Sequence, residues 1–92
     1  MAGDPGSDPL VGELREQISA NDLEIVRAVN RRLELVRRLK DHKREHGYDF
    51  LDRGREEALV AELERQNAGP LSSAGLREFH ATLLDLTKRE LN

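Results

Sequence analysis

One long stretch, from Leu10 to His46, carries helical apolar spacing with no proline and a single glycine, Gly12, near its start. Apolar residues three or four positions apart are typical of an amphipathic helix. Gly47 follows the stretch and supplies a helix-stop signal. At 1.5 Å per residue such a helix is roughly 50 Å long. A compact domain of this size has a radius of gyration of only about 12 Å, so the helix is too long for an ordinary small domain.

The rest of the sequence predicts two shorter helices and no strand. Asp52 is a plausible N-cap for a helix over residues 52–67, and the break at residues 67–70 ends it. Ser72 or Ser73 then caps a third helix that runs to the C-terminus. Residues 1–9, rich in Asp, Gly and Pro, are expected to be a disordered leader before a domain over residues 10–92. The predicted fold is all-α, with one long and two shorter helices.

The long helix also predicts an assembly. Its apolar stripe consists of Leu14, Ile18, Ile25, Val29, Val36 and Leu39. Two shorter helices cannot cover a stripe of that length. Its spacing does not keep the strict heptad repeat of a coiled-coil arm. We therefore expect a second copy of the chain to cover it, in an intertwined helical homodimer.

Composition excludes several classes of protein. The 92 residues contain no cysteine, which rules out a disulfide scaffold and a zinc site built on thiolates. With 15 basic and 18 acidic residues, the net charge of −3 argues against a nucleic-acid partner. No stretch approaches the roughly 20 apolar residues of a membrane span. The N-terminus has no apolar signal-peptide core, so a cytoplasmic location is expected.

Two cations of the long helix fall inside its apolar stripe. Arg32 and Lys43 are 11 residues apart, close to three full turns, so both are expected to face the core about 16 Å apart. A buried unpaired cation is costly. The second predicted helix has carboxylates in a similar position: Glu56 lies on its apolar face, and Asp52 lies one turn earlier.

Two interpretations of these charges remain open. In one, Asp52 and Glu56 neutralise the inward-facing cations in a buried salt-bridge network. In the other, the excess of positive charge binds a dianion, since guanidinium groups pair with carboxylates in bidentate fashion. The cations considered are Arg15, Arg32, Lys43 and Arg55.

Other chemically capable residues are expected to have ordinary roles. His42 and His46 have metal-ligand spacing but lie toward the solvated side, so no metal site is predicted. Lys40 is assigned to a solvated face, and Phe50 is expected to anchor a turn in the core. The stripe of the third helix consists of Leu76, Phe79, Leu83 and Leu86, with His80 on its edge as a packed surface histidine and Thr87 beside it.

Four segments in order resemble the all-helical chorismate mutases of the AroQ class. They are residues 14–22 (LREQISAND), residues 30–35 (NRRLEL), Lys43 and residues 52–56 (DRGRE). The resemblance covers nearly the whole chain beyond the leader. It implies an intertwined dimer of three-helix chains that converts chorismate to prephenate by a Claisen rearrangement, toward Phe and Tyr in the shikimate pathway, without a cofactor.

The resemblance also implies roles for the cations. Arg15 would reach into the partner's active site and bind a carboxylate of chorismate. Arg32 would bind a carboxylate within its own chain, and Arg55 would help to hold the carboxylates. Lys43 would donate to the ether oxygen. Together with Glu56, Arg32 and Lys43 are the expected catalytic residues.

The remaining site residues lie on the second and third helices. Asp52 and Glu56 would contact the ring hydroxyl, and Thr87 would take the place of a serine that the family usually has. Four residues on, the family usually has a Gln or Glu that contacts the ether oxygen, but this chain has Leu91, which cannot donate a hydrogen bond.

This departure leaves alternatives to chorismate mutase. The same scaffold could act on 4-amino-4-deoxychorismate as a mutase, or on isochorismate as a pyruvate lyase. It could also be a non-catalytic helical interaction module that binds another shikimate-pathway enzyme.

Overall fold

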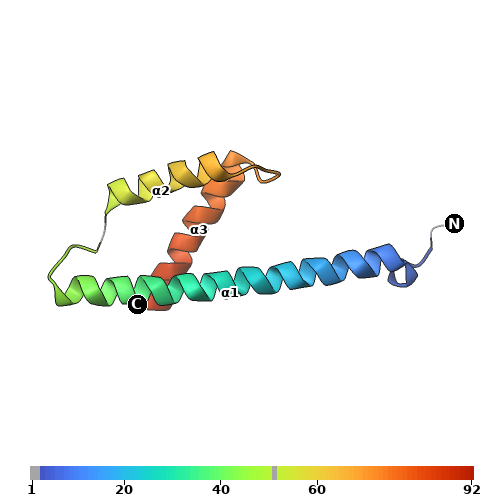
Figure 1. The fold of residues 1–92 in the computed structure, drawn as a ribbon, viewed down its shortest axis with the longest axis horizontal. Helices are drawn as coiled ribbons and strands as arrows, with labels where there is room; N and C mark the ends of the chain where they lie inside the picture. The colour runs from blue at the N-terminus through green and yellow to red at the C-terminus, as the bar shows by residue number, and fades with distance from the viewer. Residues whose placement is uncertain (1–2, 51) are drawn as a thin grey trace. The chain divides into compact units, whose positions relative to one another are not determined.

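The computed structural model describes residues 3–50 and 52–92 and has helices joined by short connections, with no strand, in these ranges (Figure 1). A short 3-10 helix, η1 (Pro5–Ser7), precedes the long helix α1 (Pro9–Glu45). Two shorter helices follow, α2 (Arg53–Gln66) and α3 (Ser73–Leu91). The predicted all-α class, with one long and two shorter helices, is confirmed. Of the predicted leader, Met1 and Ala2 lie outside the described residues.

Side-chain and backbone caps fix both ends of α1. The backbone N–H of Leu10 donates to the Asp8 carboxylate at 2.9 Å, and Pro9 occupies the first helical position, where its missing N–H costs nothing. At the other end Gly47 has a positive φ of 69°, the left-handed conformation that favours glycine. Tyr48 N–H donates to the Lys43 carbonyl at 2.8 Å, and Gly47 N–H donates to the Arg44 carbonyl at 3.3 Å. These two bonds form a Schellman motif, which ends the helix one residue before the predicted end.

The shorter helices begin at the predicted caps. The Asp52 carboxylate accepts a hydrogen bond from Arg55 N–H at 3.0 Å, and the Ser72 hydroxyl accepts one from Gly75 N–H at 3.0 Å. Between the helices, the Asn67 side chain accepts from Gly69 N–H at 3.0 Å and donates to the Leu71 carbonyl at 2.8 Å. These local bonds explain why short sequence signals were sufficient to place α2 and α3.

The chain divides into two compact units, residues 1–34 and residues 35–92. The first unit contains η1 and the first part of α1, and none of its described residues is buried. Six of its large apolar side chains are 46–59% exposed: Leu10, Leu14, Ile18, Leu23, Ile25 and Val26. Val29, which belongs to the predicted stripe, is half-buried. In the first unit, three residues of the predicted stripe, Leu14, Ile18 and Ile25, are therefore uncovered within one chain. Helices of this kind gain most of their stability from packing of that face.

The second unit contains the end of α1, α2 and α3. Helices α2 and α3 pack against each other, and an ion pair of 2.5 Å joins Arg77 Nε on α3 to Glu64 on α2. Three side chains are buried among the described residues, and all are on α3: Leu76, His80 and Thr87. Phe50, which was expected to anchor a turn in the core, is 43% exposed, so that expectation is wrong for the single chain. Phe79, of the predicted stripe on α3, is 51% exposed. The core of one chain is too small to cover them.

No helix in the described part of the chain has the length and apolar character that a membrane crossing requires.

Candidate active site

Lys43 lies in the last turn of α1, where the Schellman motif turns the chain back toward its side chain. The residue is half-buried, and its Nζ donates to the Phe50 carbonyl at 3.2 Å. The same Nζ is 5.7 Å from the centroid of the Phe50 ring, within the range of a cation–π interaction. No carboxylate lies within 4.0 Å of this ammonium among the described residues. Lys43 therefore offers a positive charge with unused donors next to an aromatic ring.

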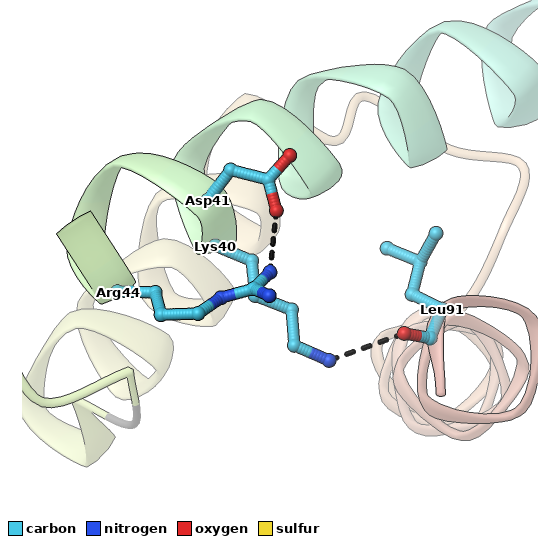
Figure 2. A network of polar contacts seen from close by, with 4 residues as sticks. All are labelled: Lys40, Asp41, Arg44 and Leu91. Atoms are coloured by element: carbon cyan, nitrogen blue, oxygen red, sulfur yellow. Dashed lines mark hydrogen bonds and ion pairs between the residues drawn. The ribbon is translucent and has the colours of Figure 1, made fainter.

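Lys40, one turn before Lys43, is not on a solvated face as the sequence indicated. It is half-buried, and its Nζ donates to the Leu91 carbonyl at the end of α3 at 3.1 Å (Figure 2). This Nζ is also 5.9 Å from the centroid of the Phe50 ring. The expectation was wrong because a lysine has a long, flexible stem that can lie along the protein while its charged end reaches a polar partner.

The N-cap and the first turn of α2 hold three of the predicted site residues. Asp52 and Arg55 are exposed, and the N-cap hydrogen bond joins the Asp52 carboxylate to the backbone of Arg55. Glu56 is half-buried one turn after Asp52. It lines an open pocket of about 450 Å³ between α2 and α3, whose lining also includes Glu57, Val60, Ala61, Arg77, His80 and Leu84. The carboxylate of Glu56 is thus at the edge of a cavity large enough for a small molecule.

His80 lines this pocket, and the sequence-based expectation for its exposure is wrong. The expectation was a surface histidine, but the residue is only 5% exposed. Its Nε2 is buried and has no hydrogen-bond partner among residues 3–50 and 52–92. It lines a pocket between α2 and α3, which pack against each other, so the sequence of α3 alone does not indicate this burial.

Thr87 and Leu91 lie one turn apart on α3. Thr87 is buried, and its hydroxyl donates to the Leu83 carbonyl at 2.7 Å. Leu91 is half-buried and presents an apolar side chain where the resemblance implies a donor.

The two remaining predicted residues, Arg15 and Arg32, lie on α1 within the first unit. Arg15 is exposed, and Arg32 is half-buried. The second unit therefore contains five of the predicted site residues: Lys43, Asp52, Arg55, Glu56 and Thr87. Arg15 and Arg32 belong to the first unit.

The sequence model of the family described as chorismate mutase type II matches residues 14–91. Because the match covers most of the chain, the chain belongs to this family, which is the AroQ class, and it is an isomerase. No curated protein and no solved structure matched the chain.

Proposed function

We propose that this chain converts chorismate to prephenate at a cationic site that a second copy of the chain completes. The match to the type II chorismate mutases spans every predicted site residue, from Arg15 to Thr87. The structural observation that carries the proposal is the half-buried Lys43 ammonium, which has no carboxylate partner among the described residues. Such a group is suited to an anionic ligand that brings the missing negative charge.

The chemistry requires positioning and electrostatics and no external reactant. One ether C–O bond of chorismate breaks while a C–C bond forms within the same molecule, so atoms and charge balance without a nucleophile or a cofactor. Arg15, Arg32 and Arg55 hold the two carboxylates, which folds the enolpyruvyl chain over the ring. Holding the reacting atoms in this arrangement removes much of the entropic barrier.

Lys43 stabilises the transition state in this proposal. Negative charge develops on the ether oxygen as the C–O bond breaks, and an ammonium already in place interacts more strongly with that charge than with the ground state. The Phe50 carbonyl and ring support this placement, because the Lys43 Nζ donates to the carbonyl and lies within cation–π range of the ring. Asp52 and Glu56 accept a hydrogen bond from the ring hydroxyl, and Thr87 contributes to the wall of the site.

The homodimer is part of the proposal. Four residues of the predicted stripe on α1 are 46–59% exposed: Leu14, Ile18, Ile25 and Leu39. Monomeric proteins rarely leave so long an apolar stripe in water. A second copy that covers this stripe brings its own Arg15 to the neighbouring site, so each site uses residues of both chains. The product feeds the formation of Phe and Tyr.

Product identification tests the proposed function. The purified chain is mixed with chorismate, isochorismate and 4-amino-4-deoxychorismate in parallel, and the products are identified by NMR. We expect chorismate to be consumed and prephenate to appear. Release of pyruvate would instead indicate a lyase, and turnover of the amino analogue alone would indicate a different mutase. If the chain does not consume chorismate, and chorismate does not raise the melting temperature of the chain, the chain is an interaction module.

A further inference from the structure

Lys40 is a cation for which the proposed mechanism has no role. Its Nζ donates to the carbonyl of Leu91, the last residue of α3. Figure 2 shows that this carbonyl oxygen is turned toward the ammonium. Carbonyl groups in the last turn of a helix have no partner within the helix and carry partial negative charge, which favours a cation there. This contact fixes the position of the Lys40 charge at the C-terminal end of α3.

Lys40 and Lys43 together place two positive charges at one aromatic ring. Their Nζ atoms are 5.9 and 5.7 Å from the centroid of Phe50. Like charges three residues apart on a helix repel each other. Neither ammonium has a carboxylate within 4.0 Å in the described part of the chain. An anionic ligand would remove this repulsion and pair with both charges.

Lys40 also contacts the backbone of the residue whose side chain lacks the expected donor. The resemblance to the family predicts a Gln or Glu at position 91 that contacts the ether oxygen, and the apolar side chain of Leu91 cannot do so. The ammonium of Lys40 lies 3.1 Å from the backbone of that same residue. It has three N–H donors, of which the described structure uses one.

We propose that Lys40 is a second catalytic cation, which donates to the ether oxygen of the bound dianion together with Lys43 and so replaces the donor that Leu91 lacks. This inference rests on the proposed chorismate mutase activity. The inference places this hydrogen-bond donor to the ether oxygen on α1, whereas the family pattern places it on α3.

The first test removes the charge and the donor with Lys40→Met, which keeps the length of the side chain. We expect kcat to fall about 100-fold, as for the loss of one preorganised donor, with a much smaller change in KM. Lys88→Met, on the exposed side of α3, is the matched control and should keep the activity of the unmodified chain. Lys40→Gln retains a donor without the charge, and we expect it to lose less activity than Lys40→Met.

The second test separates a catalytic role from a structural one. In the double variant Lys40→Met/Leu91→Gln, an amide donor is restored from α3, and we expect kcat to recover at least tenfold over Lys40→Met alone. A Lys40 that only fastens the end of α3 would not show this recovery, because the new side chain does not restore the contact to the backbone of residue 91. The melting temperature of each variant is measured alongside.

Three results would overturn the inference. They are a Lys40→Met variant as active as Lys88→Met, a Lys40→Gln variant no more active than Lys40→Met, and a loss of activity that Leu91→Gln does not recover. In these cases the unmodified chain is still active on chorismate, so the proposed function stands. An unmodified chain that does not consume chorismate would overturn both proposals.

Discussion

Replacement of Lys43 by alanine tests the electrostatic part of the mechanism. The Lys43 Nζ is half-buried and held by the Phe50 carbonyl at 3.2 Å, so its position is set before the substrate arrives. Loss of one such preorganised donor typically costs about 3 to 4 kcal/mol of transition-state stabilisation. This corresponds to a decrease in kcat of roughly 100- to 1,000-fold. KM should change much less, because the three arginines contribute most of the ground-state binding in this account.

The same substitution should have only a modest effect on stability. It removes one hydrogen bond to a carbonyl and one cation–π contact, each worth about 1 kcal/mol. It also removes the repulsion between Lys43 and Lys40, which acts in the opposite direction. We therefore expect the free energy of unfolding to fall by about 1 to 2 kcal/mol. A large loss of kcat in a variant that is still fully folded at the assay temperature distinguishes a role in catalysis from a role in folding.

Arg44→Ala is the matched control for Lys43→Ala. Arg44 is the next cation along α1, its side chain is 70% exposed, and it forms an ion pair of 2.5 Å with Asp41 (Figure 2). Exposed pairs of this kind contribute about 0–1 kcal/mol, so this variant should keep its activity. Initial rates of chorismate loss give kcat and KM for both variants. If Lys43→Ala retains turnover within about threefold of Arg44→Ala, the role assigned here to the ammonium is refuted.

Three further substitutions test other parts of the structure. Asp52→Ala removes the N-cap of α2 and should destabilise the protein by about 1 kcal/mol in chemical denaturation, whereas Asp52→Asn, which can still cap, should not. Ile25→Asp places a charge on the exposed apolar stripe of α1 and should abolish the dimer in analytical ultracentrifugation; a dimer that persists would show that the stripe is not the interface. His80→Leu removes the buried Nε2 without a described partner and should stabilise the protein by about 1 kcal/mol in thermal unfolding, and a lower melting temperature would show that this nitrogen has a partner in the assembled protein.

Local signals were sufficient to predict the elements of this fold. Asp52, Ser72 and Gly47 define helix ends through hydrogen bonds to residues within five positions, so short sequence patterns contain the necessary information. The periodicity of α1 also predicted a stripe that one chain cannot bury, and Leu14 and Ile18 are exposed accordingly.

Contacts between elements were not predictable in the same way. Lys40 lies about 60° from Lys43 around the helix axis, and a helical projection assigned it to the solvated side. Its actual contact is with Leu91, which is 51 residues away in the sequence. Phe50 lies in a connection without periodicity, and its position beside both lysines follows from the turn at Gly47. These residues change the description of the site, because they add a second ammonium and an aromatic ring to it.

The roles of Arg15 and Arg32 depend on the family resemblance and on a second chain. Nothing in the periodicity of α1 distinguishes Arg15 from other exposed cations of the same helix. A trans role for it stays a prediction that only a dimer can test.

Mixed dimers test the central claim, that two chains share each active site, most directly. Arg15→Ala and Arg32→Ala chains, each inactive alone, are unfolded together, refolded in equal amounts and assayed with chorismate. If Arg15 acts in the partner's site, each heterodimer has one intact site, and random pairing should restore about a quarter of the native activity. Activity no higher than that of the separate variants would contradict the account and show that each chain builds its own site.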